Sequence, residues 1–462
     1  MSSSQDPSDE ECAVDFSSMN GIDLSRLPPK VYLRNDAALK ATRREIYGLL
    51  TGSSSSIAPM IIISLTDPLF LHVPRYPTTL VVRVKQTGLV KARMCLRGDR
   101  MSTTHHSFLS SPTIGRSIVK VMVSLAATFQ YTIAACDITQ AFLQSTTMDV
   151  ADQYVALPPP CVILSDLKWS GLVASEPDVS RRRGFAFLRR KPLYGSKCAP
   201  LRWYLTVSGI LRRAGYRCHR SDLCIFIRRQ AGILVSIVIL HVDAFLICAT
   251  SDEHEYFQKS ISLKSGPIIH LTVHDSFVFC GLTFLCTKNG SFGISQDEYR
   301  SRLIPIDRGF AVDVPVAPLK LSSLSRICRA FVGGSLWMLQ TRYGISFLTI
   351  KLATLVSLVE SDVDSRREFI QISQIIAQTL FQTDVAIWFH PIPSNCDISR
   401  LQLIAFADAG FHSLPLSSSI ESFCIGWDCP YFAMGLFIVI SIWFIGIRAN
   451  SAVLLVPRCR AK

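Results

Sequence analysis

The feature that most constrains the fold of this chain is the run ILVSIVILHVDAFLICA at residues 233–249, which is apolar almost throughout. Only the stretch from His241 to Ala244 interrupts it, so we expect two strands that meet there. Because apolar side chains would lie on both faces of these strands, both faces should be buried. The run therefore predicts a central sheet with one carboxylate, that of Asp243, at the meeting point of two buried strands.

The pattern from residue 41 onward mixes helices and strands. Helical periodicity and capping signals, with Gly52 ending the first helix, predict helices at residues 41–52, 117–129, 323–356 and 365–383. Alternating or continuous apolar runs predict further strands, two of them around the Thr87–Gly88 turn, at residues 78–86, 90–96, 131–138 and 401–410. No repeat of fixed period is visible, so the pattern indicates an α+β protein of several domains with a mixed central sheet.

Composition and charge favour a globular chain that meets a polyanion. Of the 462 residues, 49% are hydrophobic and 18% charged, which favours a globular over a disordered chain and excludes a small disulfide scaffold, collagen and a coiled coil. Lys and Arg number 48 against 35 Asp and Glu, a net charge of +13. The first 25 residues hold six acidic and no basic side chains, so the remainder is more basic still. Such a body suits nucleic acid or an anionic membrane surface.

The cysteines and the N-terminus indicate where the protein resides. The 15 cysteines are scattered, with no CxxC pair and no zinc-site spacing, so we expect free and mostly buried thiols. The N-terminal segment is acidic and rich in serine, unlike a secretion signal. We therefore expect an intracellular protein, cytoplasmic or nuclear, that is not secreted.

Two carboxylates at strand ends carry the strongest chemical signal. Asp137 ends the predicted strand in AACDITQAF, and Asp243 lies in ILHVDAFLI. Burying an ionised carboxylate costs several kcal/mol unless a cation or hydrogen bonds offset it. Such a pair suits Mg²⁺, which binds oxygen ligands together with substrate phosphates, and two such ions catalyse phosphoryl transfer. Taken singly, each aspartate could instead cap a turn or pair with an arginine.

The order of motifs from about residue 41 to 400 resembles the reverse transcriptase of copia-type LTR retrotransposons. The matching segments, in family order, are VKARMCLRGD, SSPTIGRSIVKVMVSLAA, CDITQAFLQSTT, YVALPPP, KPLYGSKCAPLRWY, LHVDAFLI, FCGLTF with GSFGISQDEY, and RAFVGGSLWMLQTRYGISF. A further segment, FADAGFHS, resembles the first strand of the appended RNase H domain. The resemblance implies a right-hand polymerase with a mixed-sheet palm, fingers and thumb, followed by a partial RNase H-like segment.

The resemblance also assigns roles to individual residues. Asp137 and Asp243 would bind two Mg²⁺ ions, for which Mn²⁺ could substitute, while a primer 3′-hydroxyl attacks the α-phosphate of a deoxynucleotide. Lys91, Arg93 and Arg97 would face the triphosphate, although Lys/Arg alternation along a strand is otherwise typical of a solvated face.

The residues expected around the nucleotide come from two further motifs. Tyr194 and Gly195, with Pro200, would form a turn and helix start beside the templating base pair; taken alone, LYG is an ordinary turn. Phe142 would exclude a ribose 2′-hydroxyl, a discrimination that requires a tight pocket, or it could simply be a core residue.

A basic cluster is expected to bind template or primer phosphates with a steep salt dependence. Its members are Arg181, Arg182, Arg183, Arg189, Arg190 and Lys191. They follow a Pro-rich stretch in a region, 158–183, that looks like an inserted loop, where a charge run is often only solvated. The expected partners are an RNA template, a DNA primer and deoxynucleoside triphosphates; the sequence predicts no oligomeric state.

The chain departs from the family pattern at two places. Position 244 is Ala where the family has a second aspartate, and Asp252 and Glu253 lie too far along the chain to substitute for it. Loss of even a residue that only supports a metal ligand costs about 10–100-fold, so polymerase activity should be impaired. After Asp408 only Glu421 and Asp428 remain, which predicts no ribonuclease activity.

These observations define the expected domains and three functions. The expected domains are an acidic leader (1–40), reverse transcriptase fingers and palm (41–310), a helical thumb or connection (311–400) and a truncated RNase H-like segment with an apolar tail (401–462). The expected function is an RNA-directed DNA polymerase fragment; the alternative is a catalytically inactive nucleic-acid-binding remnant. The third possibility is a tail-anchored membrane protein, because residues 431–447 are uncharged and mostly apolar, at the short limit for a spanning helix. The family has no such span, so no stable membrane partner is expected.

Overall fold

The structure is a computed structural model that describes most of the chain. The described residues are 35–52, 57–64, 68, 72–84, 88–101, 110–146, 154–158, 185–261, 263–306, 318–382, 386–391, 401–408, 436–444 and 447–457. Helix α2 (Asp36–Thr51) begins before the predicted boundary at residue 40, because the Asn35 side chain accepts hydrogen bonds from the amides of Ala37 and Ala38 at 3.0 and 3.2 Å. It ends at Gly52, whose φ of 77° is the left-handed conformation expected for a helix-ending glycine.

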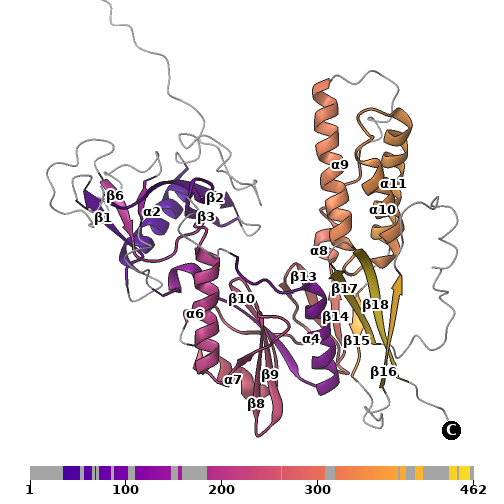
Figure 1. Cartoon of the computed structure of the whole chain (residues 1–462), viewed down its shortest axis with the longest axis horizontal. Helices are drawn as coiled ribbons and strands as arrows, with labels where there is room; N and C mark the ends of the chain where they lie inside the picture. The colour runs from indigo at the N-terminus through magenta and orange to yellow at the C-terminus, as the bar shows by residue number, and fades with distance from the viewer. Residues whose placement is uncertain are drawn as a thin grey trace, which may run out of the picture. The chain divides into compact units, whose positions relative to one another are not determined.

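The chain divides into two compact units (Figure 1). The first comprises residues 1–113, 137–223 and 259–266, and the second comprises residues 114–136, 224–258 and 267–462. Both units are therefore assembled from distant stretches of chain, whereas the domains predicted from the sequence were contiguous.

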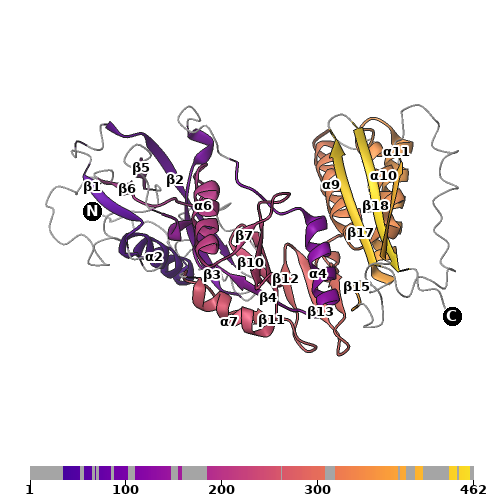
Figure 2. The ribbon, with the colours of Figure 1, turned by 60° about the horizontal axis from the view of Figure 1, so that its bottom comes forward.

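The first unit is built on a five-stranded sheet, with α2 packed on it (Figure 2). In sheet order the strands are β1 (Met60–Ser64), β6 (Phe185–Arg189), β5 (Val155–Leu157), β2 (Arg75–Val84) and β3 (Val90–Leu96). The predicted antiparallel pair is confirmed, with Val84 opposite Val90. Ile46 and Leu49 of α2 share a core with Met94 of β3.

The remaining elements of the first unit follow the sheet strands along the chain. They are η2 (Gly98–Arg100), η3 (Ala141–Gln144), α6 (Ala199–Arg213) and β7 (Arg217–Cys218).

A six-stranded sheet contains the apolar run with which the sequence analysis began. Its order is β11 (Ile269–His270), β4 (Thr132–Asp137), β10 (Ala244–Ala249), β9 (Ile233–His241), β8 (Ile225–Gln230) and β7. Strands β9 and β10 form an antiparallel hairpin, and most of their side chains are buried, as predicted. The predicted buried helix is α4 (Arg116–Phe129), which packs Val119 and Val123 against Ile239 and Leu246. Helix α7 (Ser251–Ser260) follows β10.

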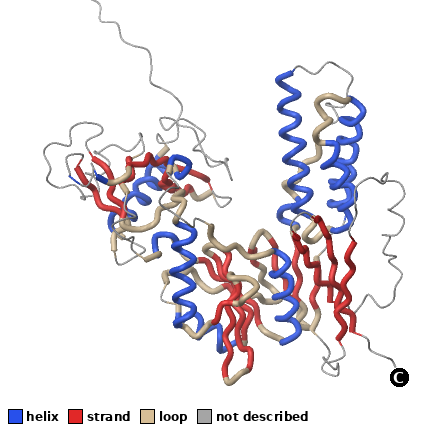
Figure 3. Tube along the Cα trace, viewed as in Figure 1, coloured by secondary structure: helices blue, strands red, loops and turns tan. Residues whose placement is uncertain are grey.

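The second unit contains a four-stranded sheet and a bundle of helices (Figure 3). The strands are β12 (Phe277–Phe279), β13 (Leu282–Cys286), β14 (Phe292–Ser295) and β15 (Ile387–Phe389), and α8 (Asp297–Arg300) follows β14. The bundle consists of α9 (Pro318–Met338), η6 (Tyr343–Ile345), α10 (Ser346–Leu355) and α11 (Val363–Gln382). The helix predicted at 323–356 is thus two helices, because Arg342 has a non-helical backbone (φ −122°, ψ 67°).

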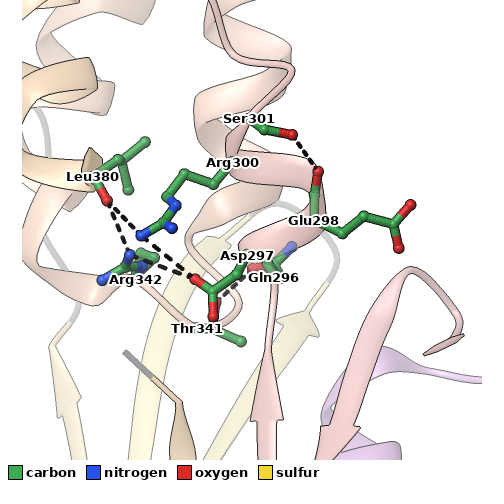
Figure 4. A network of polar contacts seen from close by, with 8 residues as sticks. All are labelled: Gln296, Asp297, Glu298, Arg300, Ser301, Thr341, Arg342 and Leu380. Carbon is green, nitrogen blue, oxygen red and sulfur yellow. Dashed lines mark hydrogen bonds and ion pairs between the residues drawn. The ribbon is translucent and has the colours of Figure 1, made fainter. Parts of the chain in front are cut away.

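A polar network joins the bundle to the end of β14 (Figure 4). The guanidinium of Arg342 donates to the carbonyl of Leu380 at 3.1 Å and lies 3.8 Å from the carboxylate of Asp297. The hydroxyl of Thr341 donates to the side-chain oxygen of Gln296 at 2.8 Å. The α9–α10 connection is therefore fixed both to α11 and to the residues that follow β14.

The C-terminal described segments form a three-stranded sheet in the order β16 (Leu401–Asp408), β18 (Ile447–Pro457) and β17 (Leu436–Phe444). The late strand predicted at residues 401–410 is confirmed. Within the apolar tail, Leu436–Phe444 is a strand, and across the described part of the chain no helix has the length and apolar character to cross a membrane. Glu421 and Asp428 lie outside the described residues.

Candidate active site

Asp243 lies in a two-residue turn between β9 and β10. His241 and Ala244 are paired across the hairpin, so Val242 and Asp243 are its two central residues. Val242 has φ 56°, a conformation that glycine usually supplies at the first central position of such a turn and that strains a β-branched residue. The turn therefore presents the Asp243 carboxyl group from a backbone held by two buried strands.

His241 precedes this turn and faces the core of the second unit. Its ring contacts Phe279 at 6.0 Å between centroids. Burial lowers the pKa of His241, while the adjacent Asp243 acts in the opposite direction and Arg116 lowers the pKa further. His241 is therefore held by packing rather than exposed as an extra polar group.

Asp137 is the last residue of β4, and its side chain is exposed. Strand β4 is the neighbour of β10, and Thr132 at the start of β4 donates a hydrogen bond to the carbonyl of Ala249, the last residue of β10, at 3.0 Å. The two strands must therefore run antiparallel. Consequently, the end of β4 and the start of β10 share one edge of the sheet.

The two side chains predicted to bind metal at this edge, Asp137 and Asp243, are both carboxylates, whose oxygen atoms are the ligands that Mg²⁺ prefers. Within the described ranges, no group of three or more His, Cys, Asp or Glu side chains is gathered closely enough to hold a metal ion. Any ion here would thus need further oxygen ligands from water or substrate phosphates.

Position 244, where the resemblance implies a second aspartate, is part of a regular strand. Ala244 begins β10 and packs partly against the core beneath the sheet. Of the two acids considered as substitutes, Glu253 is buried in α7 and forms an ion pair with Arg228, and Asp252 is exposed on the same helix. Neither follows the Asp243 turn directly, and Glu253 is already committed to another cation.

The basic strand β3 is only partly available to an anionic ligand. Lys91 and Arg93 alternate with buried residues and are exposed, as predicted. Arg97 instead makes a bidentate pair with Asp99, with nitrogen–oxygen distances of 3.0 and 2.8 Å. That pairing raises the pKa of Arg97 and lowers the pKa of Asp99. A phosphate would have to compete with Asp99 for this guanidinium.

The Tyr194–Gly195 turn docks directly on the free edge of β3. The amide of Leu96 donates to the carbonyl of Tyr194 at 2.7 Å. Gly195 has φ 80°, and a Cβ there would come within 2.2 Å of the Leu96 carbonyl oxygen, so no other residue fits without a backbone shift. Gly98 is equally restricted, because its Cβ would lie 2.0 Å from the Gly195 oxygen.

Three predicted nucleotide-binding residues come together at this turn. The Arg93 guanidinium lies 5.1 Å from the centroid of the Tyr194 ring, and the ring of Phe142 lies 5.6 Å from the same ring. Lys91 is on the same face of β3 as Arg93. The predicted helix start is also present, with Pro200 in the first turn of α6.

The predicted basic cluster does not form one surface. Arg181, Arg182 and Arg183 lie outside the described residues. Arg190 is exposed, whereas Arg189 has 0% and Lys191 8% of its surface exposed. The expectation that all three described residues contact phosphate therefore fails for Arg189 and Lys191, because alternation along the end of β6 directs both inward.

Sequence reasoning missed two polar side chains near these residues. Gln144 donates to the carbonyl of Lys264 at 2.8 Å and accepts from the amide of Lys264 at 2.7 Å, which straps η3 to that segment. Glu45 of α2 is buried and accepts from the amide of Met94 at 3.2 Å on the free edge of β3. Burial raises the pKa of Glu45 to about 7. The sequence could have indicated the burial of Glu45, because Glu45 lies on the same apolar helix face as Ile46 and Leu49.

Asp408, the predicted RNase H residue, is the last residue of β16, where its backbone is paired with Asn450 of β18. Free thiols are confirmed for the cysteines whose side chains are described, since none of them is in a disulfide.

Comparison with known proteins gives consistent matches. A family model described as reverse transcriptase (RNA-dependent DNA polymerase) matches residues 75–308. The chain is 27% identical over 275 residues to the retrovirus-related Pol polyprotein from transposon RE1 of Arabidopsis thaliana, covering 57% of this chain and 17% of that protein. It is 27% identical over 190 residues to the transposon Ty1-DR1 Gag-Pol polyprotein of Saccharomyces cerevisiae, covering 39% and 10%.

Other matches follow the same pattern. The retrovirus-related Pol polyprotein from transposon TNT 1-94 of Nicotiana tabacum is 24% identical over 158 residues, covering 34% of this chain and 10% of that protein. The chain therefore spans less than a fifth of the length of these polyproteins. A solved foamy viral protease–reverse transcriptase in complex with double-stranded DNA matches with 12% identity and a TM-score of 0.45, over 81% of this chain and 52% of that one.

Proposed function

Because the chain belongs to the reverse transcriptase (RNA-dependent DNA polymerase) family, in the form found in copia/Ty1-type retrotransposon Pol polyproteins, we propose that it binds an RNA template with a DNA primer and deoxynucleoside triphosphates. The proposed reaction is nucleotidyl transfer to the primer 3′-hydroxyl. The observation that carries the proposal is the shared sheet edge at which β4 ends in Asp137 and the β9–β10 turn holds Asp243.

In this proposal Asp137 and Asp243 hold two Mg²⁺ ions, with Mn²⁺ as a possible substitute. When bound, the metal would lower the pKa of the attacking hydroxyl and neutralise charge on the phosphates. The protein's own contribution is positioning: the strained Val242 backbone fixes the direction of Asp243, and Asp137 is exposed at its strand end.

The nucleotide is proposed to bind at the Tyr194–Gly195 turn. Lys91 and Arg93 supply positive charge for the triphosphate, and Arg97 joins them once it leaves Asp99. Phe142 is proposed to exclude ribonucleotides by filling the space that a 2′-hydroxyl needs. The contacts among Arg93, Tyr194 and Phe142 support this arrangement.

We further propose that Ala244 weakens catalysis in this chain. An alanine has no oxygen to bind or orient a metal, and Ala244 occupies the position where the resemblance implies the second aspartate. The alternative function is therefore nucleic-acid binding without polymerisation, which the net charge of +13 favours equally. No ribonuclease activity is proposed for the segment that contains Asp408, and the intracellular location inferred from the free cysteines also stays a proposal.

Primer extension on an RNA template, with Mg²⁺ or Mn²⁺, tests the polymerase proposal. We expect weak extension by the wild type, a gain of about tenfold or more in Ala244→Asp and none in Asp137→Asn. No extension by wild type and no gain in Ala244→Asp would leave only the binding function. Template–primer affinity that falls steeply with salt is expected for both functions, and its absence at low salt would contradict both.

A further inference from the structure

Two inward-facing cations in the first unit hold the turns that carry Phe142 and Tyr194. Arg189 ends β6, and Lys191 follows two residues later, so both side chains point to the same, buried side while Arg190 between them is exposed. Burial lowers the pKa of Arg189 and of Lys191, which means that enclosing each charge is costly. A charge enclosed in this way has to be offset by hydrogen-bond acceptors around it.

Lys191 supports the turn that contains Phe142. Its ammonium group donates to the carbonyl of Ser145 at 2.5 Å, in a buried contact. The amide of Ser145 in turn donates to the carbonyl of Phe142 at 3.2 Å. On the other side, the Gln144 side chain binds the backbone of Lys264. Lys191 and Gln144 thus fix η3 from two directions, and η3 contains Phe142.

Arg189 supports the turn that contains Tyr194 and Gly195. It donates to the hydroxyl of Ser196, the residue after Gly195, at 3.3 Å, and to the hydroxyl of Tyr154. Its guanidinium also lies 3.7 Å from the centroid of the Tyr154 ring. Burial raises the pKa of Tyr154 to about 12, so this partner stays neutral and accepts the hydrogen bond through its hydroxyl oxygen.

We propose that Arg189 and Lys191 are positioning residues for the nucleotide site, and that Lys191 sets sugar selectivity by holding the Phe142 turn against Tyr194. The claim about sugar selectivity rests on the proposed function, whereas the claim that Arg189 and Lys191 hold the two turns does not. An apolar residue at position 191 could fill the same space, but it could not donate to the Ser145 carbonyl, so the turn would open more often.

Hydrogen exchange tests the structural part without any enzyme activity. In the full chain, Lys191→Met should speed amide exchange in peptides covering 141–146 by about tenfold, and Arg189→Met should do so in peptides covering 193–198. The matched control Arg190→Met removes the same charge from the exposed neighbour and should change neither. Lys191→Arg, which keeps a donor, should restore slow exchange. Equal exchange in Lys191→Met and Arg190→Met would overturn the proposal.

Two further measurements keep the test decisive. If Lys191→Met does not fold, Lys191→Gln carries the test instead, because glutamine keeps a shorter hydrogen-bond donor. This variant should show intermediate amide exchange in peptides covering 141–146. Exchange as slow as in the wild type would count against the proposal. In any chain that extends primers, including Ala244→Asp, Lys191→Met should lower the preference for deoxynucleotides over ribonucleotides about tenfold with Lys191→Arg as rescue. Faster amide exchange in Lys191→Met, with no primer extension by any variant, would refute the proposed polymerase activity but support the positioning role of Lys191.

Discussion

The acidic hairpin at His241–Ala244 and the basic segment at Arg189–Gly195 reach their conformations by different means. The hairpin is supported by apolar packing, because Phe245 and Leu246, just after it, are fully buried, and its two strands are paired through the backbone. The basic segment depends on named polar contacts, from Lys191 to Ser145 and from Arg189 to Ser196.

This difference means that the fold of the hairpin does not depend on an acidic side chain at position 244. Ala244 pairs with His241 through the backbone, which is the same for aspartate and alanine, so nothing in the hairpin requires an acid. In the basic segment each buried charge has a partner that would be left unsatisfied by its removal. At the hairpin an acidic side chain can therefore be gained or removed without affecting the fold, whereas at the basic segment removal of a buried charge should also disturb the structure.

The largest expected effect tests the apolar support of the hairpin. Phe245→Ala removes a ring that is fully buried and lies 5.3 Å from the ring of Phe257. We expect it to lower the free energy of unfolding by about 3–5 kcal/mol. Urea titration measures this, with Phe347→Ala as a control because Phe347 is 47% exposed on α10. Equal losses in the two variants would contradict the comparison.

A second prediction concerns a buried acid in the first unit. Burial raises the pKa of Glu45 from 4.5 to about 7. The folded state then binds more protons than the unfolded state between these values, so the stability contributed by protonated Glu45 falls as pH rises from about 4.5 through 7. Glu45→Gln keeps an acceptor for the Met94 amide and should be more stable than wild type by about 3 kcal/mol at pH 8, with little difference at pH 4. A variant advantage that is independent of pH would exclude this cause.

A buried cation in the second unit gives the opposite dependence. Lys120 of α4 donates to the Tyr343 hydroxyl at 2.8 Å and to the carbonyl of Gln340, and burial lowers its pKa from 10.5 to about 8. The unfolded state binds more protons between pH 8 and 10.5, so stability rises with pH over that range. Relative to Lys120→Met, wild type should gain about 3 kcal/mol between pH 7 and 10.5. Urea titrations of both chains check this; a constant difference would show that Lys120 is not desolvated.

The smallest expected effect concerns the Asp243 turn itself. Val242→Gly should relieve the positive φ and raise the free energy of unfolding by about 1 kcal/mol or less, since glycine also gains freedom in the unfolded chain. In a chain that extends primers, the same change should reduce the rate because Asp243 is less firmly held. Thermal unfolding measures the first effect; lower stability in Val242→Gly would mean that the turn is not strained.

Much of the fold could be predicted from local pattern. The strands β2, β3, β9, β10 and β16 and the helices α2, α4 and α11 follow from period and capping signals that act within a few residues. The break between α9 and α10 was missed, because Arg342 leaves the helix to bind the Leu380 carbonyl, a contact that local periodicity does not encode. Tyr194 and Gly195 were identified from their motif, whereas Gln144 and Glu45 carried only weak local signals.

The amino-acid sequence by itself determined which residues could carry charge and which segments must be buried, because hydrophobicity and period are local properties of the chain. Only the tertiary structure decided which of those charges meet solvent. It directed Lys191 inward and left Arg190 exposed, paired Arg97 with Asp99, and brought Phe142, Arg93 and Tyr194 together from distant segments. A residue's chemistry belongs to its side chain, but its partner depends on where the rest of the chain folds.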